Sequence, residues 1–181
     1  MTVRTICLHG PESTGKTVLA AALSQHLADA TGAVEIVDEY GREWCEANGT
    51  YTSMADLVMI AAEQERRITA AIARAQAAGR RWVICDTDAV MTAVWAEMLH
   101  GGQDPAFAQL TRTADLYLVP DLDLPWVEDG VRYFGQAEVR RRFMDLSLAE
   151  LDRRGLAYTM VRGQGEARVQ SALAAVRGMV G

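Results

Sequence analysis

Short apolar runs alternate with longer amphipathic stretches along the chain. A buried strand of a parallel sheet has a short, continuous apolar run, whereas a helix on such a sheet has apolar residues every three or four positions. The pattern predicts strands at 3–8, 34–37, 82–85, 116–119 and 156–161. It predicts helices at 18–27, 54–78, 89–99, 105–113, 136–154 and 166–176. Alternation of this kind indicates an α/β fold with a five-stranded parallel sheet covered on both faces.

The longest predicted helix has clear signals at both ends. Ser53 and Asp56 form a capping-box pattern, and Gly79 stands where a helix commonly terminates. The helix is expected to have one mostly small or apolar face, because apolar residues recur every three or four positions. The residues of this face are Leu57, Ala61, Gln64, Ile68, Ile72 and Ala75.

One irregular stretch interrupts the alternation late in the chain. Residues 120–135 contain two prolines and two glycines, and the stretch is rich in charge. Because a buried loop would leave polar backbone groups unpaired, this segment is expected to be exposed. We interpret residues 120–142 as a lid on a single domain spanning 1–181.

The chemistry begins with a phosphate-binding loop between the first strand and the first helix. Residues 10–17 read G-P-E-S-T-G-K-T and fit the pattern G-x-x-x-x-G-K-[ST]. Lys16 is the only lysine among the 18 lysine and arginine residues, which suits a compact charge on nucleotide phosphates. A turn that fits by chance is the alternative. The predicted nucleotide contacts are Gly10, Glu12, Ser13, Thr14, Gly15, Lys16, Thr17 and Val18.

Acidic residues follow the second and third predicted strands, where parallel sheets bind their ligands. Asp86 is expected to hold Mg²⁺ together with the hydroxyl of Thr17. Asp88 either caps the next helix or contacts the substrate. Asp38 and Glu39 are candidates for the base that accepts a hydroxyl proton, or else they cap a helix.

Residues late in the chain are further candidates for contacts to the nucleotide. Arg132, with one of the residues 140–142, is expected to neutralise charge on a transferring phosphoryl group, although consecutive arginines also suit a solvated helix face. Gly163 and Gly165 either allow close approach of an adenine or form a plain turn.

Composition narrows the class of protein. The net charge of −6 argues against broad binding to nucleic acid or a membrane surface. The 3 cysteines form no paired motif and favour reduced thiols in a cytoplasmic protein. The first strand begins so early that no signal peptide is expected. A small-molecule substrate is therefore the expected partner, and the oligomeric state stays open.

Four segments together resemble the ribosylnicotinamide kinase domain of NadR-type proteins. They are G-P-E-S-T-G-K-T, E-Y-G-R-E, D-T-D and D-L-P-W-V-E-D-G-V-R, and V-R-G-Q-G-E-A-R near the end fits the same family. The resemblance implies a P-loop kinase fold and a reaction that uses ATP and Mg²⁺. It implies phosphorylation of the ribose 5′-hydroxyl of nicotinamide riboside to give nicotinamide mononucleotide, a step of NAD salvage.

The same resemblance suggests which residues bind the substrate. Glu39 is the preferred contact to the ribose hydroxyls and is also a candidate for the catalytic base. Asp38, just before the motif, is the second choice for these roles. The full set of expected substrate contacts is Glu39, Tyr40, Arg42, Asp88, Trp126, Asp129 and Arg132. Trp44 and Trp95 are weaker candidates, because a helical tryptophan is more often part of the core.

Other functions stay open at this stage. A kinase for another nucleoside or small metabolite shares all of the phosphate chemistry. A guanine-nucleotide switch is disfavoured, because the chain has no Asn-Lys-x-Asp segment. A non-catalytic nucleotide-binding regulator is disfavoured by the intact set of Lys16, Thr17 and Asp86. Whether GTP can replace ATP as the donor and whether nicotinic acid riboside is accepted stay open.

Overall fold

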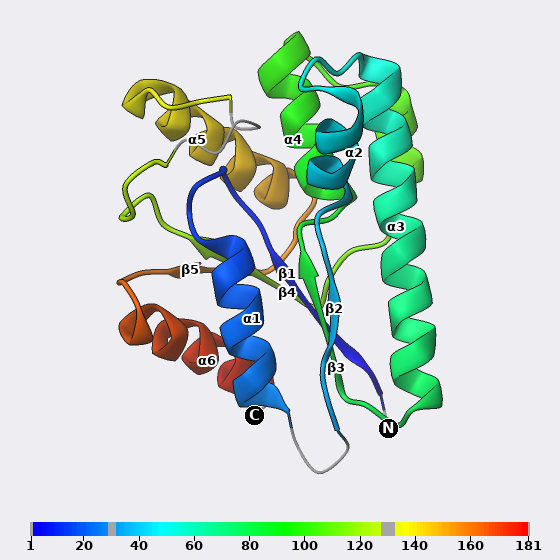
Figure 1. Ribbon diagram of the computed structural model, residues 1–181, viewed down its shortest axis with the longest axis vertical. Helices are drawn as coiled ribbons and strands as arrows, with labels where there is room; N and C mark the ends of the chain where they lie inside the picture. Colours follow the sequence, from blue (N-terminus) through cyan, green and yellow to red (C-terminus); the bar gives the residue numbers. More distant parts are fainter. Residues whose placement is uncertain (1, 29–31, 128–132, 181) are drawn as a thin grey trace.

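The computed structural model describes residues 2–28, 32–127 and 133–180 and has the predicted alternation of strands and helices (Figure 1). The strands are β1 (Arg4–Leu8), β2 (Glu35–Val37), β3 (Trp82–Asp86), β4 (Leu116–Pro120) and β5 (Tyr158–Val161). The α-helices are α1 (Lys16–Leu27), α2 (Tyr40–Asn48), α3 (Met54–Ala77), α4 (Ala89–His100), α5 (Ala137–Arg153) and α6 (Glu166–Val180). A 3₁₀ helix, η1 (Pro105–Gln109), precedes β4.

All five strands belong to one parallel sheet with the order β2-β3-β1-β4-β5. The prediction of a five-stranded parallel sheet is confirmed. Since β1 is central, its carboxyl end has β3 and β2 on one side and β4 and β5 on the other. The loop after β1 therefore lies between two groups of strand ends, and this arrangement positions the site.

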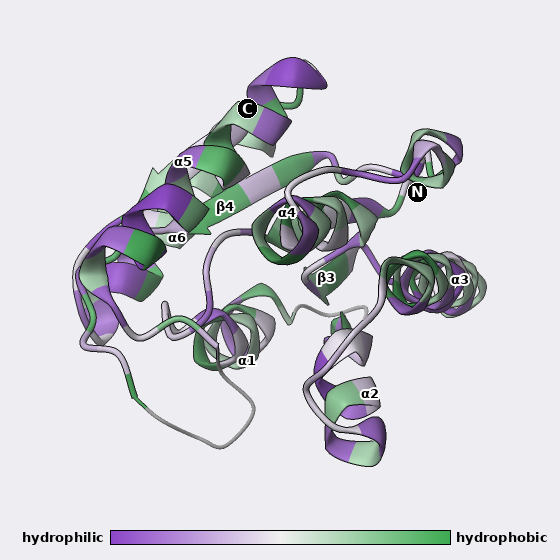
Figure 2. Ribbon diagram, turned by 90° about the horizontal axis from the view of Figure 1, so that it is seen from above, coloured by the Kyte–Doolittle hydropathy of each residue, from purple (hydrophilic) through white to green (hydrophobic). Residues whose placement is uncertain are grey.

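The sheet is covered on both faces because its strands alternate between two cores. Ile6, Ile84 and Leu118 point toward α1 and α6, whereas Val83 and Tyr117 point toward α3 and α5. Seen from above in Figure 2, α1 and α4 lie on opposite sides of β3. The strands are thus apolar on both faces, as their sequences predict.

Helix α3 begins as the sequence predicts. The Ser53 side chain accepts a hydrogen bond from the Asp56 backbone N–H, and the Asp56 carboxylate accepts one from the Ser53 backbone N–H. This reciprocal pair satisfies two of the N–H groups that a helix start leaves unpaired.

Two elements differ from the sequence-based expectation. Helix α2 was not predicted, because none of its residues is buried and Gly41 near its start weakens helical propensity. The predicted helix 105–113 is instead the short η1, anchored by the buried Phe107 and begun by the Asp104 carboxylate, which accepts from the Ala106 backbone N–H. Both elements depend on neighbouring segments more than on their own periodicity.

Candidate active site

The phosphate-binding loop has the curled backbone that its glycines predict. Gly10 and Gly15 have φ of 125° and 78°, and Ser13 also has a positive φ of 58°. Gly15 stands at the start of α1, so the positive end of the helix dipole lies under the loop. Lys16 donates hydrogen bonds from Nζ to the carbonyl oxygens of Gly10 and Pro11, at 2.9 and 2.8 Å. Its ammonium therefore lies along the loop that is expected to hold phosphates.

Thr17, in the first turn of α1, meets Asp86 at the end of β3. The Thr17 hydroxyl donates to Asp86 Oδ2 at 2.5 Å. Asp86 is 3% exposed, and its other oxygen, Oδ1, is buried with no hydrogen-bond partner among the residues that the structure describes. A buried carboxylate oxygen without a partner suits a metal ion or its bound water.

The chemistry of this pair therefore fits Mg²⁺. Within the described ranges there is no group of three or more His, Cys, Asp or Glu side chains that could hold a metal ion. A magnesium ion here would thus use Thr17, Asp86, water and nucleotide oxygens, which is how Mg²⁺ is commonly held in nucleotide sites.

Glu39 follows β2 and faces the same space. It stands at the N-cap position of α2, yet within the described part of the chain its side chain makes no capping hydrogen bond. Burial raises the pKa of Glu39, and the nearby positive charge of Lys16 opposes this rise. Asp38, by contrast, is exposed. Of these two acids, Glu39 is the one at the site.

One glutamine holds the backbone on both sides of Glu39. Gln64 is 1% exposed, and its Oε1 accepts from the Tyr40 backbone N–H at 2.8 Å. Its Nε2 donates to the carbonyl oxygens of Asp38 at 3.2 Å and Thr87 at 3.4 Å. The sequence pattern placed Gln64 on the apolar face of its helix, and a polar residue on such a face was the signal for this role.

A cleft of about 1120 Å³, including its open mouth, extends from the phosphate-binding loop between α2, α3 and α4. Its end near the strands is polar, with Lys16, Thr17, Glu39 and Gln64. Glu12, Ser13, Gly15, Val18 and Arg42, all predicted contacts, also line it. The remaining lining residues are Gly41, Cys45, Thr52, Leu57, Ile60, Thr87, Met91, Thr92, Trp95, Leu99 and Tyr133.

The part of the cleft away from the strands is apolar and aromatic. Trp95 lies 5.5 Å from Tyr133 and 5.7 Å from Phe134 between ring centroids, and it meets the Phe143 ring edge-on at 4.7 Å. The sequence favoured a core role for Trp95, but it contacts both the core and the cleft. Tyr133 was not predicted, because it follows the irregular segment and has no periodic context.

The phosphate-binding loop is joined to this aromatic wall through Glu12. One carboxylate oxygen, Oε1, accepts from the backbone N–H groups of Tyr133 and Phe134 at 2.8 and 2.6 Å. The Ser13 hydroxyl also accepts from the Val127 backbone N–H at 3.0 Å. The described ends of the predicted lid therefore lie against the loop.

Other predicted residues lie away from the cleft. Asp88 is a buried N-cap of α4: Oδ1 accepts from the backbone N–H groups of Val90 and Met91, and Oδ2 accepts from the Tyr117 hydroxyl at 2.5 Å. The expectation that Asp88 binds substrate is thus replaced by its capping role. Tyr40 instead has its ring under the guanidinium of Arg67, 4.3 Å from the centroid.

The other predicted contacts, in the lid and in the turn after β5, are not among the described residues that line the cleft. The Trp126 ring lies beside Gly135, where an added Cβ would be 3.4 Å from the ring, and Trp126 is not among the described residues that line the cleft. Gly163 and Gly165 form the turn between β5 and α6, with φ of 92° and 52°. Asp129 and Arg132 lie outside the described residues.

The three consecutive arginines have different surroundings. Arg140 is buried and donates to the carbonyl oxygens of Ser13 and Leu124, both at 3.4 Å. Arg141 and Arg142 are exposed, as expected for a solvated helix face. Of the three, Arg140 is the one that reaches the phosphate-binding loop.

Comparison with known proteins identifies the family of the chain. A family model described as an AAA domain matches residues 5–168, which is most of the chain. The chain belongs to this AAA domain family. The described part of this AAA domain contains no helix with the length and apolar character needed to cross a membrane.

Two curated relatives are similar to this AAA domain over nearly all of its length. The trifunctional NAD biosynthesis/regulator protein NadR of Escherichia coli K12 is 26% identical over 99% of the chain and 43% of its own length. The protein of the same name from Salmonella typhimurium LT2 is 28% identical over 88% of the chain and 38% of its own length. The resemblance to NadR-type proteins is thus confirmed, and the chain spans about two fifths of these relatives.

Solved structures share the fold. A NadR protein in complex with NR has a TM-score of 0.75 at 23% identity, covering 98% of this chain and 49% of that one. A NadR protein in complex with NAD and AMP-PNP has a TM-score of 0.74 at 24% identity, with coverage of 98% and 49%. Thymidylate kinase from Ehrlichia chaffeensis has a TM-score of 0.73 at 16% identity, with coverage of 99% and 100%. The predicted P-loop kinase fold is confirmed.

Proposed function

We propose that this chain transfers the γ-phosphoryl group of ATP to the ribose 5′-hydroxyl of nicotinamide riboside, giving nicotinamide mononucleotide. The observation that carries the proposal is one cleft that joins Lys16 and Glu39 to the aromatic pair Trp95 and Tyr133. The similarity to NadR proteins, one of which is solved with NR, supports the choice of acceptor.

The donor phosphates bind the loop 10–17 in this proposal. Backbone N–H groups at the start of α1 and the Lys16 ammonium stabilise the charge that develops on the transferring phosphoryl group. Mg²⁺ held near Thr17 and Asp86 would neutralise charge on the β- and γ-phosphates. The Thr17 hydroxyl and the buried Asp86 carboxylate oxygen would hold that ion.

Glu39 acts as the base that orients the acceptor hydroxyl and accepts its proton. Its raised pKa, which follows first from burial, brings the carboxylate nearer to the basicity that such a role needs at neutral pH. Gln64 keeps Glu39 in position from both flanking peptide groups. As the 5′ oxygen forms its bond to phosphorus, the bond from phosphorus to the β–γ bridging oxygen breaks and ADP leaves.

The length of the cleft, from Glu39 to the aromatic wall, suits a ribose followed by the nicotinamide ring. Glu39 and Cys45 are six residues apart in or beside α2, or about 9 Å along a helix, and Met91 and Leu99 are about 12 Å apart along α4. Nicotinamide riboside carries a fixed positive charge on its ring. Aromatic faces attract such a cation by about 0.5–2 kcal/mol, so Trp95 and Tyr133 favour this ring over a neutral base.

The lid residues remain part of the proposal. Trp126, Asp129 and Arg132 match the family segment D-L-P-W-V-E-D-G-V-R, and we expect Arg132 to meet the phosphoryl group in the reacting state. The turn containing Gly163 and Gly165 is assigned to the adenine of ATP.

A panel of acceptors tests the proposal. ADP release by the purified chain with ATP and Mg²⁺ is measured for nicotinamide riboside, nicotinic acid riboside, uridine, cytidine, adenosine and thymidine. We expect nicotinamide riboside to be far better than every neutral nucleoside. Equal or faster turnover of a neutral nucleoside would contradict the assigned acceptor but not the kinase, whereas no acceptor-dependent ADP release would contradict both.

A further inference from the structure

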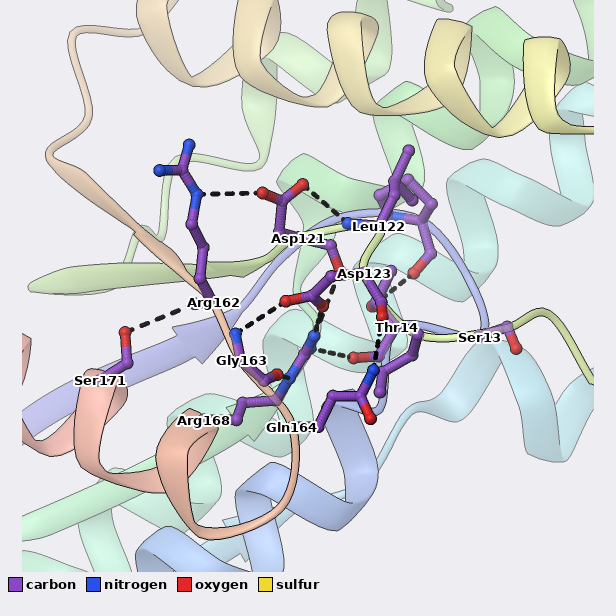
Figure 3. A network of polar contacts seen from close by, with 12 residues as sticks. Ser13, Thr14, Asp121, Leu122, Asp123, Arg162, Gly163, Gln164, Arg168 and Ser171 are labelled. Atoms are coloured by element: carbon purple, nitrogen blue, oxygen red, sulfur yellow. Dashed lines mark hydrogen bonds and ion pairs between the residues drawn. The ribbon is translucent and has the colours of Figure 1, made fainter.

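Arg168, on the first turn of α6, is the centre of a buried polar network (Figure 3). The residue is 4% exposed, although it carries a guanidinium. Nε donates to the Gly163 carbonyl oxygen at 2.7 Å, and Nη1 donates to the Thr14 carbonyl oxygen at 2.6 Å. Nη2 forms an ion pair with Asp123 and donates to the Asp121 carbonyl oxygen at 3.4 Å.

These partners come from three segments that are distant in sequence. Thr14 belongs to the phosphate-binding loop, Asp121 and Asp123 follow β4, and Gly163 follows β5. Because β1, β4 and β5 are adjacent in the sheet, the segments meet at its carboxyl edge. Two strand spacings separate β1 from β5, or about 10 Å.

Asp123 strengthens the link between two of the segments. Its Oδ2 accepts from the Gly163 backbone N–H at 2.7 Å, and its backbone carbonyl accepts from Gln164 Nε2 at 3.1 Å. The turn after β5 is therefore bound by both Arg168 and Asp123. The cleft described above lies on the other side of β1, beside β2 and β3, so this network belongs to neither its walls nor its floor.

We propose that Arg168 is a positioning residue for the donor nucleotide: it sets the distance between the loop that binds the phosphates and the turn assigned to the adenine. The inference rests on the donor half of the proposed function. A planar guanidinium with donors in a rigid fork is suited to this task, because it bonds several carbonyl oxygens at fixed angles. Lysine has the charge but not the fork.

A role in nucleotide positioning differs from a purely structural role in one measurable way. ATP spans both the phosphate loop and the turn, whereas tripolyphosphate contacts only the loop. If Arg168 fixes their separation, its replacement removes the extra affinity that the adenosine part gives to ATP. General destabilisation would weaken both ligands, and the acceptor, to a similar degree.

Calorimetric titration of the whole chain with ATP and with tripolyphosphate, both with Mg²⁺, tests this inference. We expect Arg168→Lys and Arg168→Met to reduce the affinity advantage of ATP over tripolyphosphate by about tenfold or more. Binding of nicotinamide riboside is expected to change less than about twofold. Arg162→Met is the matched control. Arg162 lies in the turn between β5 and α6, and its side chain is 75% exposed and paired with Asp121.

A second variant, Asp123→Asn, tests the inference if Arg168→Met does not fold. If Arg168→Met is unfolded by circular dichroism, Asp123→Asn, which weakens the ion pair at a partly exposed position, is expected to give a smaller change in the same direction. An unchanged ATP-to-tripolyphosphate ratio in folded Arg168→Lys and Asp123→Asn overturns the inference alone. Equal weakening of both ligands and of the acceptor also overturns it. Failure of the wild-type chain to bind ATP overturns the donor assignment together with the inference.

Discussion

The side-chain amide of Gln64 accepts a hydrogen bond from the Tyr40 backbone N–H at 2.8 Å, and this contact fixes the peptide that follows Glu39. The same amide donates to the carbonyl oxygen of Asp38 on the other side. Gln64→Leu keeps a similar volume but removes these bonds. Since hydrogen bonds of this kind contribute about 0.5–1.5 kcal/mol each, we expect kcat to fall about tenfold or more.

The Gln64 prediction is checked by ADP release at saturating substrates. Gln76→Leu, an exposed position on the same helix, is the control and is expected to leave kcat unchanged. Wild-type kcat in folded Gln64→Leu would show that Glu39 does not need this support.

Removal of the Lys16 ammonium should abolish most of the activity without unfolding the chain. Lys16→Ala is expected to cost about 3 kcal/mol or more of transition-state stabilisation, because charge on the phosphoryl group loses its nearest fixed cation. ADP release measures the loss and circular dichroism the fold. Lys16→Arg is expected to remain poorly active, because a guanidinium does not fit the space of a point charge. High turnover in Lys16→Ala would contradict the assigned phosphate site.

The aromatic wall of the cleft should determine acceptor affinity. Trp95→Leu keeps an apolar side chain but removes the aromatic face, so the KM for nicotinamide riboside is expected to rise about 3- to 30-fold, while the KM for ATP changes little. Trp126→Leu is the matched comparison. Because Trp126 packs beside Gly135, we expect its effect to be smaller. A larger effect of Trp126→Leu would show that Trp126 reaches the acceptor when the lid segment closes.

Replacement of the Glu39 carboxylate should abolish activity but stabilise the folded chain at neutral pH. The pKa of Glu39 is raised in the fold, first by burial, so the folded chain binds this proton more tightly than the unfolded chain does. Stability is therefore lost as pH rises from the ordinary pKa of glutamate through the raised value. Glu39→Gln should abolish turnover and raise Tm at neutral pH, with less gain near pH 4. Thermal unfolding at both pH values checks the sign, and a lower Tm of the variant at neutral pH would contradict it.

The fully buried His9 should make the fold sensitive to acid. Burial lowers its pKa to about 3, and its Nε2 lies 3.2 Å from the Ser147 carbonyl oxygen, which requires a proton on that nitrogen. The unfolded chain binds a second ring proton near pH 6.5, so stability falls as the pH decreases from about 6.5 toward 3. His9→Gln removes this contribution. Urea unfolding should show a shallower loss of stability in the variant, and an equal slope would contradict the prediction.

Features of this protein that depend on local pattern could be predicted from the amino-acid sequence. A glycine-rich turn between an apolar run and a helix predicts a phosphate-binding loop, because both the curled backbone and the helix start are encoded within a few residues. Strand and helix periodicity likewise predicted the parallel sheet, and strand ends then indicated four acids, Asp38, Glu39, Asp86 and Asp88. The parallel sheet is confirmed, and in the structure Asp86 lies beside Thr17 while Glu39 lines the cleft.

Which residues share the site depends on contacts between segments that are distant in the chain. Asp88 became a cap because Tyr117, from a neighbouring strand, bonds its second oxygen. Gln64, Trp95 and Arg168 acquired their surroundings through contacts with segments far away in the chain. Periodicity reports whether a side chain faces inward but not which segment it meets there, since that depends on strand order and on how the loops pack.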